Sequence, residues 1–462
     1  MKLKFILIFC LSLIIFSYKI GSIPAGLTID EASFGYNAVL LSRTGHDENG
    51  RFLPIFILSI NKTDWRQPIT QYFITSFFKI FPPSVFALRL TSAIIGAISV
   101  SLIYLIGGIW ASILLIFTPV FFMHTHLGLD NIMPVPFILV WLICLLNYSK
   151  NKNIKNLIIA GITIGISLYS YKGIRVFIPV WLLTSSIYIF LQGKMKAVFI
   201  YLLSALPFFL IIPYFEFQYA GAVLNNTKFD FSEPFRFIYR FLSNFDFSFI
   251  FGTGDEMLIH STGLHGALLL TSLPLFIIGL FKSWKKNIFH KFLIISIFLG
   301  PILFGFFGLI HRASKMISLV PFYCLISSFG ANWLYKEKKS IFILLSVLIF
   351  INFSIFLNYY WFKYGPSSEY LFYGMTAGQE YKTLKEISES QNLKPFVDSV
   401  ITSKNFSSGD FMRSIYFTKI PDLWNGNIKD LPMGSVLMTD NQNIKDLEKL
   451  DYEVKNFVFY KK

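Results

Sequence analysis

The stretch FILIFCLSLIIFSYKIGSIPAGLTIDE, residues 5–31, joins an apolar run to two adjacent carboxylates, Asp30 and Glu31. A secretory signal peptide also begins with basic residues and an apolar core, but no small-x-small cleavage site follows here and many further apolar runs do. We therefore interpret the run as a retained first helix with its N-terminus in the cytoplasm. A plain membrane anchor does not need two acids so near the bilayer, and their purpose is the question that the sequence raises.

The composition is that of a membrane protein. Hydrophobic residues make up 54% of the 462 residues and charged residues 15%, whereas soluble domains have about 45–50% and about 25%. The apolar runs approach the roughly 20 residues that a spanning helix needs, and the alternation typical of an outer-membrane barrel is absent. We predict a polytopic α-helical membrane protein with about eleven or more spans, near 5–20, 85–106, 109–126, 132–149, 156–170, 174–192, 197–214, 265–281, 291–310, 316–335 and 340–361.

The charges predict the orientation of these spans. Several short loops are rich in lysine and face the cytoplasm by the positive-inside rule. Two long loops, about 21–84 and 215–264, lie on the external side. The short links 127–131, 171–175 and 311–315 and the tail belong to the same external set. Every acidic residue before the tail except Glu337 falls in the external set, and every arginine is external or at the external rim. Because arginine suits bidentate binding of phosphate or carboxylate, we expect the working face to be external.

The domain prediction follows from the same charges. The tail has equal numbers of acidic and basic residues, so the net charge of +15 belongs to the membrane part and needs no nucleic-acid partner. We predict a transmembrane domain at 1–361 and an external α/β domain at 362–462. In the tail, GQEYKTLKEISES (378–390) and NQNIKDLEKL (441–450) predict helices, whereas GSVLMTD (434–440) and YEVKNFVFY (452–460) predict strands.

Two external acids are candidates for chemistry. Asp30 opens DEASFGYNAVLLSRTG, whose Phe34, Ala38 and Leu41 share one face and predict a helix lying in the membrane interface. Asp130 lies in the short link HTHLGLDNIMP (124–134). Either acid could instead be the N-cap of the helix that follows it. A carboxylate at the bilayer edge is costly unless it has a partner or a task, so the two acids could share one cavity.

Basic and mixed clusters complement these acids on the external side. Arg89 begins the second span, YSYKGIRVF (169–177) contains Lys172 and Arg175, and LIHRASKMI (309–317) contains Arg312. Snorkelling to the interface explains one such cluster, but three suggest a site for an anionic headgroup.

The loop FIFGTGDEMLIHSTGLHG (249–266) adds Asp255 and His260 to the candidates. A divalent metal is an open alternative there, although the spacing is not that of a metal site, and the sequence establishes no cofactor. Cys10, Cys144 and Cys324 lie in apolar runs, so neither a disulfide framework nor a thiolate site is expected.

At these residues the sequence resembles the dolichyl-phosphate-mannose protein mannosyltransferases and the related aminoarabinose transferases of the C-type glycosyltransferase superfamily. The resemblance rests on segments in a fixed order, among them TIDEASFGYNAVLLSRTGHDENGRFLPI (28–55), WRQPITQYF (65–73), SLYSYKGIRVFIP (167–179) and HRASKMISLVPFY (311–323). It implies the C-type glycosyltransferase fold and transfer of a hexose or pentose, with inversion, from a polyprenyl-phosphate donor to a protein, lipid or glycan acceptor. The site would lie on the external face of the cell membrane.

The resemblance also implies residue roles. Asp30 matches the catalytic general base and Asp130 the acid of the second external loop. Basic positions near the donor phosphate correspond to Lys172, Arg175 and Arg312, and the remaining candidates for substrate binding or an auxiliary role are Glu31, Tyr36, Arg89, Asp255 and His260. Close family members often have an arginine directly before the histidine that corresponds to His260, and this sequence has Ile259 at that position.

Two other functions would also use many spans and charges at the membrane rim. A transporter or flippase for a lipid-linked glycan should have ionisable residues in mid-membrane and paired internal repeats, and neither is evident in the sequence. A non-catalytic protein of cell-envelope assembly would use the tail to bind partners. Both alternatives predict that Asp30 is dispensable for sugar transfer.

Overall fold

The computed structural model describes residues 2–224, 233–307, 310–372, 378–401, 407–454 and 457–462. The chain packs into two compact units. Unit 1 comprises Met1–Ile20, Gln67–Thr70 and Arg89–Phe362, and unit 2 comprises Gly21–Arg66, Gln71–Leu88 and Lys363–Lys462. Each unit is described by itself.

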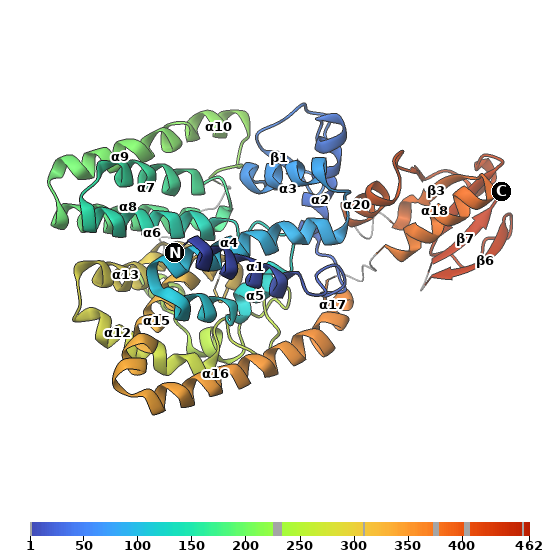
Figure 1. Cartoon of the computed structure of the whole chain (residues 1–462). Coiled ribbons are helices and arrows are strands. Elements are labelled where there is room, and N and C mark those ends of the chain that lie inside the picture. The colour runs from blue at the N-terminus through green and yellow to red at the C-terminus, as the bar shows by residue number, and fades with distance from the viewer. Residues whose placement is uncertain (1, 225–232, 308–309, 373–377, 402–406, 455–456) are drawn as a thin grey trace. The chain divides into compact units, whose positions relative to one another are not determined.

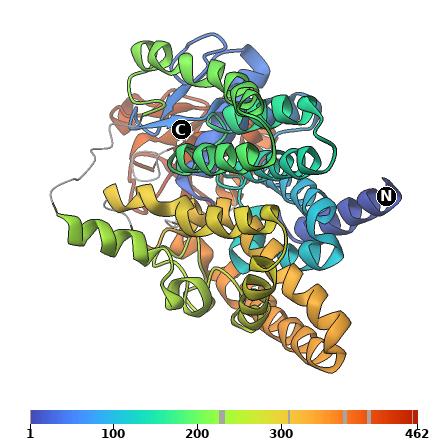
Figure 2. The same cartoon turned by 90° about the vertical axis from the view of Figure 1, so that its left-hand side faces the viewer.

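Unit 1 is helical (Figure 1). Its principal helices are α1 (Lys2–Ser17), α4 (Val85–Ile116, in this unit from Arg89), α5 (Pro119–Thr125), α6 (Pro134–Asn151), α7 (Ile154–Ser167), α8 (Ile178–Gln192), α9 (Met195–Leu210), α10 (Ile212–Gln218), α11 (Pro234–Ser243), α12 (Leu273–Trp284), α13 (Ile288–Leu299), α14 (Ala313–Met316), α15 (Val320–Glu337) and α16 (Lys339–Tyr359). Helices α6 to α9 pack together, and α12, α13, α15 and α16 form a second group, as both views show (Figures 1 and 2).

Five helical stretches in the described residues are long and apolar enough to cross a membrane: Val85–Ile116, Met195–Gln218, Ile288–Phe306, Ala313–Glu337 and Lys339–Ser368. Shorter apolar helices cover Ile154–Ser167, Ile178–Gln192 and Leu270–Trp284. Large apolar side chains on α9 and α16, such as Phe199 and Phe350, are not covered by the rest of the protein. Such exposure suits helices that face lipid. The chain is a helical membrane protein, and the count of about eleven spans stays a prediction.

Helix α4 is interrupted at Gly108, where the sequence predicts a turn between two spans. Gly108 has φ +73° and ψ −164°, a backbone conformation that is essentially confined to glycine. The Ser112 hydroxyl donates a hydrogen bond to the carbonyl of Val100, twelve residues earlier. Twelve residues of straight helix would span about 18 Å, so the chain folds back at this glycine.

Unit 2 contains the first long loop and the tail. The loop forms α2 (Ile29–Thr44), β1 (Ile57–Ser59), β2 (Asp64–Arg66) and α3 (Pro68–Ile80, in this unit from Gln71). The tail forms α17 (Gly365–Leu371), α18 (Gln379–Gln391), β3 (Lys394–Asp398), α20 (Ser407–Tyr416), β4 (Asp422–Trp424), β5 (Ser435–Thr439), β6 (Glu448–Val454) and β7 (Phe457–Lys461). The sheet order is β4-β3-β5-β7-β6, with β3 parallel to both neighbours and β7 antiparallel to both of its own.

The tail agrees with three of its four predicted elements. Helix α18 and strand β5 form where the sequence predicts them, and the predicted strand 452–460 contributes to β6 and β7. The helix predicted over 441–450 is wrong, because strand β6 begins at Glu448 and pairs with β7. Pairing with a neighbouring strand overrides a local helix preference, which is worth less than 1 kcal/mol per residue.

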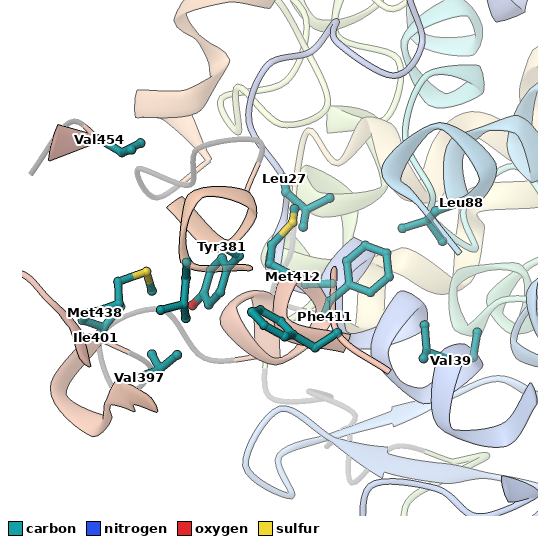
Figure 3. Close-up of a cluster of buried hydrophobic side chains, with 14 of the residues drawn as sticks. Leu27, Val39, Leu88, Tyr381, Val397, Ile401, Phe411, Met412, Met438 and Val454 are labelled. Carbon is teal, nitrogen blue, oxygen red and sulfur yellow. The ribbon is translucent and has the colours of Figure 1, made fainter. Parts of the chain in front are cut away.

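One hydrophobic core joins the first loop to the tail within unit 2 (Figure 3). The loop contributes Phe34 and Val39 from α2, and the tail contributes Phe411 and Met412 from α20, all of them buried. Phe34, Ala38 and Leu41, the predicted apolar face of α2, are buried within the protein together with six further residues of this helix. Its position in the membrane interface stays a prediction.

Candidate active site

A capping box fixes the start of α2 and separates the roles of the two acids. The Glu31 backbone N–H donates to Thr28 Oγ1, and the Thr28 backbone N–H donates to Glu31 Oε2, both at 3.0 Å. This reciprocal pair satisfies two of the donors that every helix leaves open at its N-terminus. The reading of Asp30 as the N-cap is therefore wrong, because Thr28 is the cap. Glu31 is fully buried in a structural role.

Asp30 is held by an arginine from strand β2. Arg66 Nη1 lies 2.8 Å from Asp30 Oδ1, and its Nη2 lies 3.3 Å from Asp64 Oδ2. The Arg66 side chain is 4% exposed and the Asp30 side chain 53%. The guanidinium also lies over the Phe34 ring, 4.9 Å from its centroid, a favourable cation–π distance. The buried Arg66 guanidinium thus orients the Asp30 carboxylate, which itself faces solvent.

Arg66 is a residue of the candidate site that the sequence did not single out. Its signal was present in WRQPITQYF, where an arginine follows Asp64 by two residues in the external loop that also contains Asp30. The loop has no periodicity that would align Arg66 with Asp30, because the pairing depends on the β1–β2 hairpin.

A buried polar network continues along the Asp30 face of α2. Ser33 donates from its hydroxyl to Ser59 at 2.6 Å, and Asn37 Nδ2 donates to Glu48 Oε1 at 2.9 Å. The Glu48 backbone N–H in turn donates to Asn37 Oδ1 at 3.0 Å. Burial raises the pKa of Glu48, while the hydrogen bonds from Asn37 and Ser59 partly oppose the rise. These bonds fasten the loop that follows α2 to the helix.

Tyr36 contacts the hydrophobic core of unit 2 rather than the polar network of Ser33 and Asn37. It packs, half-buried, against the core of unit 2. Burial and the charge of Asp410 raise its pKa to about 12, against the opposing effect of Arg413. Its auxiliary role in substrate binding stays a prediction.

In unit 1, Arg175 lies in a short 3₁₀ helix, Lys172–Val176, and its guanidinium is largely committed to the protein. Nε donates to the Leu168 carbonyl at 2.9 Å and Nη1 to the carbonyls of Ala222 and Val223, while Nη2 donates to the side chain of Gln67. Four of its five N–H groups are therefore used by uncharged acceptors. This geometry suits a structural role in which Arg175 holds the segment at Ala222 and Val223. One N–H group of the guanidinium is left for the predicted contact with the donor phosphate.

Glu216 holds the same segment from the other side. Its carboxylate accepts from the backbone N–H groups of Gly221, Val223 and Leu224 at 2.6–2.8 Å. The segment is thus held through its carbonyls by Arg175 and through its amides by Glu216. Asp130, which is half-buried, also lies near enough to attract the Arg175 charge. Helix α6 is preceded by Met133 as its cap residue, so the reading of Asp130 as that N-cap is wrong.

Asp255 organises the second loop. Its side chain is fully buried and accepts from the backbone N–H of Ala313 at 2.7 Å and of Met257 at 2.8 Å. Arg312 Nη1 lies 3.5 Å from Asp255 Oδ1, and the Arg312 side chain is 28% exposed. Burial raises the pKa of Asp255, and the hydrogen bonds and Arg312 oppose the rise. Asp255 thus sets the position of a half-exposed cation.

His260 is paired with a histidine of α5. His124 Nδ1 lies 2.7 Å from the Val120 carbonyl, so it carries the proton. Its Nε2 then accepts from His260 Nδ1 at 3.2 Å, which leaves Nε2 of a neutral His260 as a lone-pair acceptor. Burial lowers the pKa of His260 well below its ordinary value. Among the described residues, no three His, Cys, Asp or Glu side chains are grouped to hold a metal ion.

Arg89 is also buried in unit 1. Its side chain is 1% exposed, and Nη1 donates to the Ile20 carbonyl at 3.3 Å. The structure therefore places Asp255, Arg312 and His260 around one loop, and Asp130 near Arg175. Asp30 belongs to unit 2, and its convergence with Lys172 and Arg312 stays a prediction.

Residues 66–216 match the family model of the dolichyl-phosphate-mannose-protein mannosyltransferases. The resemblance predicted from the sequence is confirmed. The part that matches the mannosyltransferase model begins at Arg66 and includes Arg89, Asp130, Lys172 and Arg175. No curated protein sequence matches the chain.

Two solved structures of one protein, ArnT, align with nearly the whole chain. ArnT from Cupriavidus metallidurans in the apo state aligns with a TM-score of 0.57 at 8% identity, over 98% of this chain and 97% of that one. The same protein bound to undecaprenyl phosphate aligns with a TM-score of 0.53 at 10% identity, over the same shares. At such identities the likeness shows the fold, which is the C-type glycosyltransferase fold. The chain thus shares the fold of ArnT, and its residues 66–216 match the mannosyltransferase family model.

Proposed function

We propose that the protein transfers a sugar from a polyprenyl-phosphate donor to an acceptor hydroxyl at the external face of the cell membrane, with Asp30 as the general base. The proposal rests on the Asp30 carboxylate, which is half exposed at the start of a buried helix and held at one oxygen by Arg66. Its Oδ2 has no hydrogen bond to the described chain, so it can accept a proton. A lipid donor fits because ArnT, which shares the fold, has been solved with undecaprenyl phosphate.

The reaction needs little else from the protein. Asp30 Oδ2 takes the proton of the acceptor hydroxyl as that oxygen bonds to the anomeric carbon. The bond from this carbon to the phosphate oxygen breaks, its electron pair stays on the phosphate, and attack from the opposite side inverts the configuration. A polyprenyl phosphate is a stabilised leaving group, so fixed cations suffice to bind the charge that develops on it. Arg312 and Lys172 are the proposed cations.

The test compares Asp30→Asn with Asp64→Asn. Both variants remove one carboxylate partner of Arg66, but only the first removes the proposed base. Purified protein is given undecaprenyl-phosphate-linked hexoses and pentoses with lipid and envelope-protein acceptors, and released undecaprenyl phosphate is measured. Asp30→Asn should abolish release while Asp64→Asn retains most of it. Transfer by a folded Asp30→Asn variant at the unmodified rate would overturn the proposal, and the transporter reading would then gain support.

A further inference from the structure

Helix α20 of the tail packs directly on α2, the helix that carries Asp30. Both helices lie within unit 2. A Cβ atom at Gly35 would come within 2.5–2.7 Å of three ring carbons of Phe411. Ordinary carbon contacts lie at about 3.5–4.0 Å, so only glycine allows the ring this position. Phe411 is fully buried, next to Val39 and Met412 (Figure 3).

A second contact joins the far ends of the same two helices. Arg43, in the last turn of α2, donates from Nη2 to the Ser414 carbonyl at 2.9 Å and from Nη1 to the Phe417 carbonyl at 3.4 Å. These carbonyls lie at the C-terminal end of α20, where a helix leaves its acceptors unsatisfied and favours a cation. The two contacts are eight residues apart on α2, so they fix both its distance from α20 and its rotation.

We infer that α20 is a positioning element for the proposed transfer: Phe411, against Gly35, holds α2 so that Asp30 keeps its place. The inference rests on the proposed function, because it concerns the base named there. Gly35 lies five residues after Asp30, about 7.5 Å along a continuous helix. A shift at Gly35 therefore moves Asp30 too, and a misplacement of about 1 Å at a reacting group can cost about a hundredfold in rate.

The geometry supplies a matched set of variants. Gly35→Ala inserts a methyl group that must displace α2 or the Phe411 ring by about 1 Å. Phe411→Ala removes the ring, and the double variant Gly35→Ala/Phe411→Ala gives the new methyl group room. Phe396→Ala is the control, because Phe396 is a buried phenylalanine of the same tail whose cluster contains no residue of α2.

The rate constant kcat per folded molecule, the KM for the donor and the Tm are measured with the undecaprenyl-phosphate-linked sugars. We expect Gly35→Ala to lower kcat by roughly tenfold or more with KM changed less than about twofold. Phe411→Ala alone should also lower kcat, and the double variant should recover only part of kcat, because the clash is relieved while the ring that holds α2 is lost. Phe396→Ala should lower Tm and leave kcat per folded molecule unchanged. An unchanged kcat in Gly35→Ala, or a double variant no better than Gly35→Ala, would overturn the inference.

A substitution at the exposed Arg43 provides an independent arm if Gly35→Ala fails to fold. Arg43→Gln should lower kcat and Arg43→Lys should restore part of it, since lysine keeps the cation at the end of α20. Equal, unmodified kcat in both variants would contradict the inference. The two proposals fail separately: activity in Asp30→Asn removes the proposed base, whereas inactivity there combined with an unmodified Gly35→Ala removes only the role of α20.

Discussion

Arg66 Nη1 lies 2.8 Å from Asp30 Oδ1, and the two residues differ sharply in exposure, 4% for the arginine side chain and 53% for the aspartate. A buried guanidinium thus orients a carboxylate that water and substrate can reach. Arginine fits this task because its planar fork also binds Asp64 and stacks over Phe34. The pair thus fixes the first turn of α2, which carries Asp30, to strand β2, which ends at Arg66.

We expect Arg66→Lys to transfer sugar roughly ten- to a hundredfold more slowly, because an ammonium group lacks the fork whose two nitrogens contact Asp30 and Asp64 separately. Arg66→Gln should be slower still. Both are measured as release of undecaprenyl phosphate per folded molecule. If Arg66→Gln works at the unmodified rate, the arginine does not position Asp30.

The capping box predicts a stability effect without loss of chemistry. Thr28→Ala removes the side-chain acceptor of the Glu31 N–H and should destabilise the protein by about 1 kcal/mol. Glu31→Gln keeps a side-chain oxygen for the Thr28 N–H and should cost less. Thermal unfolding in detergent measures both, and sugar transfer below the midpoint should persist. Complete inactivity of a folded Glu31→Gln variant would give Glu31 a catalytic role instead.

Glu48 predicts a pH dependence of stability. Its pKa is raised in the folded protein, chiefly by burial, so between the ordinary and the raised value the folded state binds more protons than the unfolded state. Stability therefore falls as pH rises through this window. Glu48→Gln should flatten this fall while keeping an acceptor for Asn37. The midpoints of the two proteins, measured from pH 4 to pH 8, should diverge in favour of the variant toward higher pH; parallel curves would contradict the prediction.

Substitutions at Arg175 and Lys172 should have different effects, the first on folding and the second on donor binding. Arg175→Ala removes the guanidinium donor from the carbonyls of Leu168 and Val223. Each buried group left unsatisfied costs about 1–3 kcal/mol. We expect poor folding of this variant. Lys172→Ala should fold normally and raise the KM for the donor, because a cation near the phosphate is lost. A normally folded Arg175→Ala with only a raised KM would restore the phosphate role of Arg175.

The comparison of sequence and structure is informative at particular residues. Apolar runs identify membrane helices because the composition of each run reflects the lipid around it. The turn near Gly107 and Gly108 forms because Gly108 adopts a backbone conformation with positive φ. Asp30 could be selected because a carboxylate beside an apolar run is costly without a task. By contrast, the helix expected over 441–450 does not form, and strand β6 begins within this range at Glu448. Its pairing with β7 is a long-range interaction that local propensity does not contain.

The sequence by itself determined the class of protein, the external position expected for its acids and arginines, and the candidate base, because solvent preference and charge are properties of single residues and short runs. Only the tertiary structure decided that Thr28 caps α2, that Arg66 holds Asp30, and that Phe411 fits against Gly35. These contacts join residues from separate elements, up to 376 positions apart in the case of Gly35 and Phe411 (411 minus 35). Their formation depends on the packing of the whole unit rather than on any local pattern.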